Sequence, residues 1–182
     1  MTSAEPAGRQ ALLITGTVGA GKTTTAEQVG RLLGAAGTAY AVVDLDEIRR
    51  FWPMPPGDPF GVQIELANLA ALAANYLRAG AQRLVLAGVV ETRAERQLIQ
   101  AAVGVPLTVV RLTMPLPLVR RRLTIRHVDD PEGLTWHLAR AEVLEEILDA
   151  TRIADLVVDT DGLDPAEVAE RVLTGAVPPD LR

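Results

Sequence analysis

Short apolar runs alternate with longer segments of helical periodicity along most of the chain. The apolar runs fall at residues 11–15, 39–43, 84–87, 108–112 and 156–158, and each has the length of a buried strand. Apolar residues recur at helical spacing over 22–36, 62–77, 94–102, 117–126, 135–150 and 165–173. Strands that alternate with helices are typical of an α/β domain with a parallel sheet. We therefore expect a three-layer α/β/α sandwich around five parallel strands.

Three shorter segments interrupt this alternation. Residues 46–51 can form a short helix capped by Asp46. Residues 52–59 contain four prolines and a glycine, so we expect an ordered loop there. The polar stretch 127–133 contains Pro131 and is expected to be an exposed turn between two helices.

The composition restricts the classes of function. The chain has 182 residues, a net charge of -5 and no cysteine, so we expect one domain spanning 1–182 in a reducing compartment. The acidic balance argues against binding to nucleic acid or to an anionic membrane surface. The first ten residues are polar and the longest apolar run, residues 84–90, is too short to span a bilayer. We expect a cytoplasmic protein.

Residues 16–23 fit the P-loop pattern G-x-x-x-x-G-K-[ST] and lie between an apolar run and a helical segment. The glycines let backbone N–H groups surround a polyphosphate at the start of a helix. In this pattern Lys22 reaches the β- and γ-phosphates of ATP and Thr23 binds Mg²⁺; Lys22 is also the only lysine of the chain. The expected nucleotide-binding residues are Gly16, Thr17, Val18, Gly19, Ala20, Gly21, Lys22, Thr23 and Thr24.

A P-loop alone does not distinguish a kinase from an ATPase or a GTPase. The Asn-Lys-x-Asp motif of guanine-specific GTPases is absent, because Lys22 is the only lysine. Asp44 and Asp46 follow the second expected strand, at the edge of the sheet where ligands bind in this fold class. We assign Asp44 to the Mg²⁺ shell and Asp46 to the acceptor hydroxyl. The alternative is a helix cap at Asp46 and a solvated strand end at Asp44.

Two segments carry a resemblance to known kinases. Val43-Asp44-Leu45-Asp46-Glu47-Ile48-Arg49 resembles the Asp-Gly-Asp-Asn-Val-Arg stretch of adenylylsulfate kinases, and residues 91–96 are similar to their Arg-x-x-Arg segment. Glu47 replaces the family asparagine, and Glu91-Thr92 replaces the usual Ser-Pro. Over residues 11–173 the layout resembles the nucleoside/nucleotide-kinase-like branch of P-loop proteins, which includes shikimate, gluconate and chloramphenicol kinases. This resemblance implies the strand order 2-3-1-4-5 and a small helical lid at about 118–136.

The resemblance also implies roles for residues outside the P-loop. Arg49, Arg93 and Arg96 would face the acceptor, together with Asp44 and Asp46. Arg122 and Arg126, four residues apart on one helix face, would reach the transferring phosphoryl group; a solvated basic helix is the alternative. Asp161 and Gly162 would pack on adenine, or belong to an ordinary loop. The aromatic side chains of Phe51, Trp52 and Phe60 either line the acceptor pocket or pack in the core.

These observations together favour a kinase that transfers the γ-phosphoryl group of Mg-ATP to a hydroxyl of a small molecule. The expected catalytic residues are Lys22, Asp46, Arg122 and Arg126, and the expected metal-binding residues are Thr23 and Asp44. Two alternatives stay open, a non-catalytic ATP-binding module and an adenylylsulfate kinase proper. The sequence names neither the acceptor nor the oligomeric state, for which a homodimer is one option.

Overall fold

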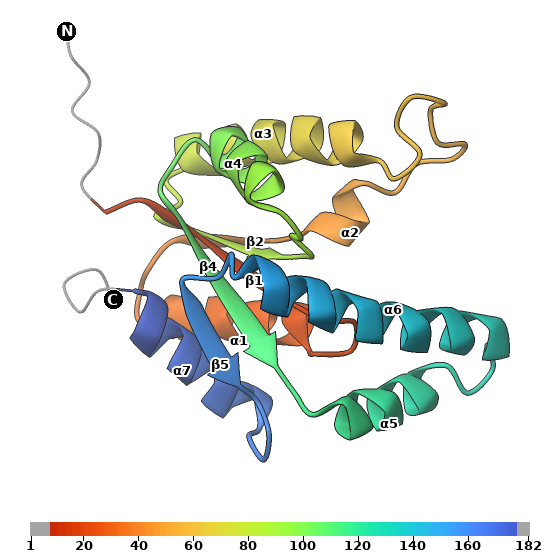
Figure 1. Ribbon diagram of the computed structural model, residues 1–182. Helices are drawn as coiled ribbons and strands as arrows, with labels where there is room; N and C mark the ends of the chain where they lie inside the picture. Colours follow the sequence, from red (N-terminus) through yellow and green to blue (C-terminus); the bar gives the residue numbers. More distant parts are fainter. Residues whose placement is uncertain (1–7, 178–182) are drawn as a thin grey trace, which may run out of the picture.

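Five parallel strands form the sheet of the computed structural model, which describes residues 8–177 (Figure 1). They are β1 (Gln10–Gly16), β2 (Tyr40–Asp44), β3 (Arg83–Ala87), β4 (Leu107–Thr113) and β5 (Leu156–Asp159). Their order across the sheet is β2-β3-β1-β4-β5, and every neighbouring pair is parallel. The expected fold class and strand order are therefore confirmed.

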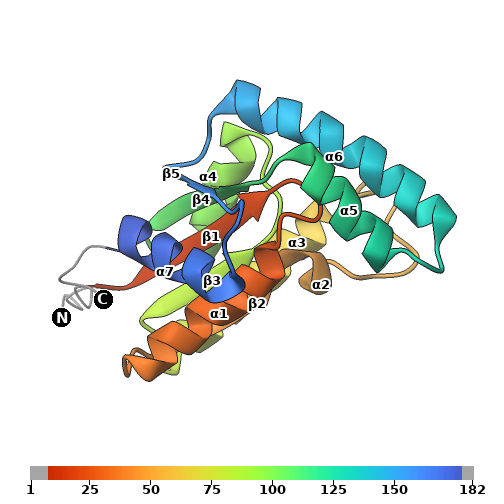
Figure 2. The ribbon, with the colours of Figure 1, turned by 90° about the horizontal axis from the view of Figure 1, so that it is seen from below.

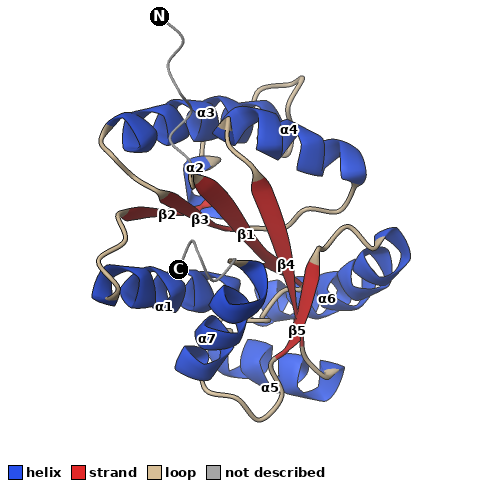
Figure 3. Cartoon of the chain, turned by 90° about the vertical axis from the view of Figure 1, so that its left-hand side faces the viewer, coloured by secondary structure: helices blue, strands red, loops and turns tan. Residues whose placement is uncertain are grey.

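Helices cover both faces of the sheet (Figure 3). They are α1 (Lys22–Ala35), α2 (Leu45–Ile48), α3 (Val62–Arg78), α4 (Arg93–Val103), α5 (Leu116–Arg126), α6 (Pro131–Thr151) and α7 (Pro165–Ala176). Helices α3 and α4 lie over one face, and α1 and α7 over the other. This arrangement is the expected three-layer sandwich.

The central strand is buried on both faces, as its continuous apolar sequence predicts. Leu13 of β1 packs with Leu69 of α3 and Ile99 of α4 on one side of the sheet. Ile14, the next residue, packs with Val29 of α1 and Val172 of α7 on the other side. The carboxyl end of β1 is therefore held firmly where the P-loop begins.

Helices α5 and α6 form a hairpin at one end of the sheet (Figure 2). This hairpin has its own apolar cluster, in which Val119 and Leu123 of α5 pack with Ala141 of α6. Leu144 and Leu148, farther along α6, belong to the core beneath α3 and α4. The C-terminal half of α6 is thus part of the main core, and its N-terminal half packs against α5.

Two local boundaries differ from the prediction. Asp44, not Asp46, caps α2, because its Oδ1 accepts a hydrogen bond from the N–H of Asp46 at 2.9 Å. Helix α6 begins at Pro131, inside the expected turn, because Asp130 caps it and proline suits the first helical turn. Residues 52–59 form no helix or strand, as expected.

The expectation of no leader peptide rests largely on residues 1–7, which lie outside the described residues. Within residues 8–177, none of the helices is both long enough and apolar enough to cross a membrane.

Candidate active site

The P-loop joins β1 to α1 through backbone that only glycine adopts easily. Gly21 precedes α1 with φ +93°, and Gly16 ends β1 with φ +148°. A Cβ atom at Gly16 would lie 2.6 Å from the carbonyl oxygen of Leu112, closer than such atoms approach. Gly21 offers no side chain to cap α1, so the first N–H groups of that helix are left for an anion.

Thr17 connects the P-loop to the helical hairpin. Its side chain is fully buried, and its hydroxyl donates a hydrogen bond of 2.7 Å to the carbonyl oxygen of Ala141 in α6. The expected role of Thr17 was in nucleotide binding, which its backbone serves in a P-loop. The side-chain contact with α6 was not predictable, because the two residues are 124 positions apart.

Lys22 lies at the centre of the site. Its ammonium group donates hydrogen bonds to the carbonyl oxygens of Gly16 at 3.2 Å and Thr17 at 3.0 Å. Burial lowers the pKa of Lys22 from 10.5 to about 8; Asp46 and Asp44 act in the opposite direction, and Arg126 lowers it further. A half-buried cation beside glycine-rich backbone is a suitable partner for a polyphosphate.

Thr23 and Asp44 form an oxygen-rich pair beside Lys22. The Thr23 hydroxyl donates to Asp44 Oδ2 at 2.6 Å, which joins the start of α1 to the end of β2. Hydroxyl and carboxylate oxygens are ligands that Mg²⁺ prefers, and Mg²⁺ usually retains several waters and binds phosphate oxygens as well. The pair therefore fits a magnesium site completed by a nucleotide. Among residues 8–177 no cluster of three or more His, Asp or Glu side chains forms an all-protein metal site.

Asp46 is the first of three adjacent charged side chains. The sequence predicted site roles for Asp46 and Arg49 but not for the third, Glu65. Arg49 donates to Asp46 Oδ1 and also lies 3.2 Å from Glu65, measured between Nε and Oε2. Glu65 comes from α3 and is buried, which raises its pKa to about 7, whereas Arg49 acts to lower that pKa. Glu65 was missed because an isolated glutamate in a helical pattern carries no signal for its partner.

These groups line a cleft of about 1600 Å³. One wall is the P-loop with α1, a second is α2 with the start of α3, and the third is the α5–α6 hairpin. The residues from the hairpin that line the cleft include Arg122, Arg126, Trp136, His137 and Arg140. A cleft of this size is large enough for a nucleotide and a second small molecule.

The two lid arginines approach the P-loop. Arg122 Nη1 lies 3.5 Å from the position that a Cβ atom at Gly21 would occupy, and Arg126 is close enough to lower the pKa of Lys22. Within residues 8–177, neither guanidinium lies in an ion pair with a carboxylate. Arg120, by contrast, is paired with Glu142. The alternative of a solvated basic helix, in which Asp129, Asp130 and Glu132 would pair with these arginines, therefore finds no support in the ion pairs of residues 8–177.

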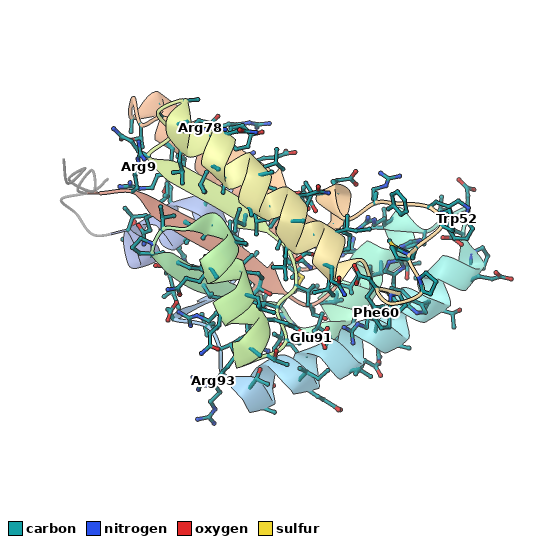
Figure 4. The ribbon with its side chains drawn as sticks, turned by 90° about the horizontal axis from the view of Figure 1, so that it is seen from above. Arg9, Trp52, Phe60, Arg78, Glu91 and Arg93 are labelled. Carbon is teal, nitrogen blue, oxygen red and sulfur yellow. The ribbon has the colours of Figure 1, made fainter. Side chains whose placement is uncertain are left out.

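The arginines after β3 lie elsewhere than expected. Arg96 donates to the carbonyl oxygen of Ile153 at 2.6 Å and to the Asp155 carboxylate at 2.8 and 2.9 Å, so it fixes the segment before β5. Arg93 begins α4 and lies at the periphery, away from Phe60 (Figure 4). Neither Arg93 nor Arg96 lines the cleft. The residue of this segment that does is Glu91, which forms an ion pair with Arg140 of α6.

The turn after β5 and the aromatic residues also differ from expectation in detail. Thr160 and Leu163 line the cleft, whereas Asp161 and Gly162 do not. The Thr160 hydroxyl donates a hydrogen bond of 3.0 Å to the carbonyl oxygen of Thr113 at the end of β4. Phe60 lines the cleft and is exposed. Phe51 and Trp52 are exposed on the neighbouring loop, so none of these three aromatic side chains packs in the core.

A P-loop before α1, the sheet order β2-β3-β1-β4-β5 and a helical hairpin over the cleft define a P-loop kinase-like fold related to small-molecule kinases. The chain belongs to the family described as "AAA domain", whose model matches residues 12–152.

Three solved structures illustrate the relationship. The tunicamycin resistance protein of Deinococcus radiodurans has a TM-score of 0.64 and 22% identity, covering 94% of this chain and 99% of that one. A gluconokinase from Sinorhizobium meliloti 1021 has a TM-score of 0.60 and 18% identity, with coverages of 92% and 91%. The APS kinase of Mycobacterium tuberculosis, solved with AMPPNP and APS, has a TM-score of 0.55 and 26% identity, with coverages of 93% and 98%. A comparison with curated proteins finds no match.

Proposed function

We propose that this protein is a kinase that transfers the γ-phosphoryl group of ATP to a hydroxyl group of a small molecule. The observation that carries the proposal is the position of Asp46 relative to the P-loop. Asp46 lines the same cleft as Lys22 and the P-loop, its N–H donates to Asp44, which accepts from Thr23, and its charge acts to raise the pKa of Lys22. An ATPase or a binding module has no need of a carboxylate that faces an acceptor there.

The proposed reaction follows from the placement of these side chains. The acceptor oxygen attacks the γ-phosphorus, a new O–P bond forms, and the bond from the γ-phosphorus to the β,γ-bridging oxygen breaks to release ADP. Asp46 accepts the proton of the acceptor hydroxyl. Lys22, Arg122 and Arg126 donate to the phosphate oxygens as charge moves toward ADP. Mg²⁺, when bound by Thr23 and the water shell near Asp44, would neutralise part of the phosphate charge.

The acceptor side of the proposal is tested by replacing Asp46 with asparagine. With γ-labelled ATP and a panel of nucleosides, sugars and hydroxylated antibiotics, we expect Asp46→Asn to lower label transfer by about 100-fold or more. ATP affinity should change by no more than a few-fold, because Asp46 does not contact the P-loop backbone. The matched control is Asp129→Asn, an exposed aspartate outside the lining of the cleft.

Two results would contradict the proposal. Full transfer by Asp46→Asn would remove the assigned role of that carboxylate. Binding of ATP by the wild-type protein without transfer of label to any acceptor would favour a non-catalytic ATP-binding module instead.

A further inference from the structure

One part of the cleft has an unusual distribution of charge. We call it the acceptor half and define it by Asp46, Arg49, Phe60, Glu65, Glu91, Trp136 and Arg140, all of which line the cleft. These residues lie on α2 and directly after it, at the start of α3, in the β3–α4 loop and on α6.

Both arginines of the acceptor half are already neutralised. Arg49 contacts Asp46 and Glu65, and Arg140 contacts Glu91. Asp46 is exposed, but Arg49, Glu65, Arg140 and Glu91 are partly or fully buried, so a new partner would have to displace a carboxylate from each arginine. The lid arginines, Arg122 and Arg126, differ because no carboxylate of residues 8–177 pairs with them. Free positive charge is thus confined to the nucleotide half.

An anionic acceptor would meet net repulsion in the acceptor half. Three carboxyl groups there face two guanidinium groups, and burial together with the nearby Asp46, Glu95 and Asp58 raises the pKa of Glu65 to about 7 even though Arg49 acts to lower it. Glu47 and Glu95 also line the cleft; Glu47 is paired with Arg50, and Glu95 accepts hydrogen bonds from backbone N–H groups. A carboxylate, sulfate or phosphate on the acceptor would therefore find no available cation.

The same half of the cleft offers exposed aromatic surface. The chain contains two phenylalanines and two tryptophans, and one of each, Phe60 and Trp136, lines the cleft. Phe60 is 76% exposed and Trp136 is 62% exposed, so both leave large apolar surface in contact with water. Figure 4 shows Phe60 near the beginning of α3. Trp136 lies four residues before Arg140 and hence on the same face of α6. Such surface is stabilised when a ligand with an apolar part covers it.

Building on the proposed kinase function, we propose that the phosphate acceptor is a hydroxyl compound without an anionic group and with an aromatic or aliphatic part. The hydroxyl end lies at Asp46, and the apolar part packs against Phe60 and Trp136. Because Arg49 and Arg140 are already paired with carboxylates, neither is available to bind a carboxylate, sulfate or phosphate group of an acceptor.

A matched pair of fluorescent probes tests this substrate class. The probes 4-methylumbelliferyl β-D-glucoside and 4-methylumbelliferyl β-D-glucuronide differ only by a CH₂OH group in place of a carboxylate. Fluorescence anisotropy with saturating AMPPNP and Mg²⁺ should show the glucoside binding about tenfold or more tightly than the glucuronide. Equal or tighter binding of the glucuronide, or no saturable binding of the glucoside, would overturn the inference.

Variants of a charged and of an aromatic residue test whether the acceptor half is the part of the cleft that distinguishes the two probes. Glu91→Gln releases Arg140 and should raise glucuronide affinity about tenfold, whereas Glu142→Gln removes the same charge from the Arg120 pair outside the cleft and should not. Phe60→Ala should weaken glucoside binding about tenfold, and Phe51→Ala, on the exposed loop, by less than twofold. Glucuronide affinity that is the same in Glu91→Gln as in the wild type would contradict the assignment.

The affinity for AMPPNP, measured on the same samples, separates this inference from the function on which it rests. If AMPPNP binds and label from ATP is transferred preferentially to anionic acceptors, the kinase function stands and the substrate class is wrong. If AMPPNP fails to bind, the kinase function is wrong, whatever the two probes show.

Discussion

Burial gives Lys22 a pKa of about 8, within the range of pH in which a kinase is assayed. A bound polyphosphate would favour the protonated amine and return this pKa toward its ordinary value. We therefore expect the single lysine of the chain to link nucleotide binding to the uptake of a proton.

We expect ATP affinity to be highest below pH 8 and to fall as the pH rises above 8, because the free protein then loses the charge on Lys22. Binding at pH 9 should take up a substantial fraction of a proton. Titration calorimetry in two buffers of different ionisation enthalpy measures this uptake directly.

The control for this experiment is Lys22→Arg, which keeps its charge at pH 9 and should show no proton uptake. Heats of binding that are independent of the buffer in the wild-type protein would refute the linkage.

The sequence predicted the geometry of the P-loop better than that of the other walls of the cleft. The P-loop motif implies its own local geometry, so the environment of Lys22 and Thr23 could be anticipated. The partnership of Arg49 with Glu65 depends on how α3 packs, which no local pattern specifies. For the same reason Arg96 was expected in the cleft although it binds Asp155.

At the scale of elements, helix α5 presents its arginines in different directions. Arg122 and Arg126 line the cleft, whereas Arg121, beside them, is exposed and does not. We expect Arg122→Ala and Arg126→Ala each to lower kcat by about 10² to 10³, because each guanidinium would stabilise charge on the transferring phosphoryl group. Steady-state kinetics with the acceptor found in the labelling assay provides the measurement.

Arg121→Ala should keep kcat within about twofold of the wild type, since its side chain faces solvent. If Arg121→Ala, Arg122→Ala and Arg126→Ala have the same kcat, α5 contributes only general positive charge to ATP binding.

Helix α3 is positioned by a buried cap. Asp58 accepts hydrogen bonds from the N–H groups of Val62 at 2.7 Å, Gln63 at 2.8 Å and Ile64 at 3.2 Å. We expect Asp58→Ala to lower the free energy of unfolding by about 1–2 kcal/mol, measured by urea denaturation. The KM for the acceptor should also rise, because the first turn of α3 carries Glu65 and adjoins Phe60.

A matched control exists at α7, where Asp164 accepts from the N–H groups of Ala166 and Glu167. Asp164→Ala should lose similar stability without any change in the KM for the acceptor. An unchanged acceptor KM in Asp58→Ala would show that the start of α3 does not shape the site.

Periodicity predicted the helices and strands because each presents an apolar face to a two-sided core. The boundaries that failed are those decided by single hydrogen bonds. Asp44 rather than Asp46 caps α2, and Asp130 allows α6 to begin at Pro131. These helix boundaries depend on side-chain geometry, which the spacing of residues in the sequence does not specify.

For the whole molecule, nucleotide binding should appear as added stability. A ligand at 100 times its Kd stabilises the native state by about 2.7 kcal/mol, which corresponds to a rise in Tm of roughly 5–10 °C for a chain of this size. We expect Mg-ATP to produce this rise in the wild-type protein, measured by thermal unfolding.

In Lys22→Ala the rise should be smaller than about 2 °C, because the variant lacks the cation of the P-loop. Equal shifts in both proteins would place ATP at a site other than the P-loop.

The hydrogen bond between Thr17 and Ala141 joins the phosphate loop to the rear of the helical hairpin. Leu144 and Leu148 anchor the inner part of α6 in the main core, so we expect any closure of the hairpin over the cleft to have its pivot near Ala141. Displacement would then grow with distance from that pivot, and Arg126 would travel farther than Arg140. Such a motion would let substrates exchange at the outer tip while the P-loop stays at rest.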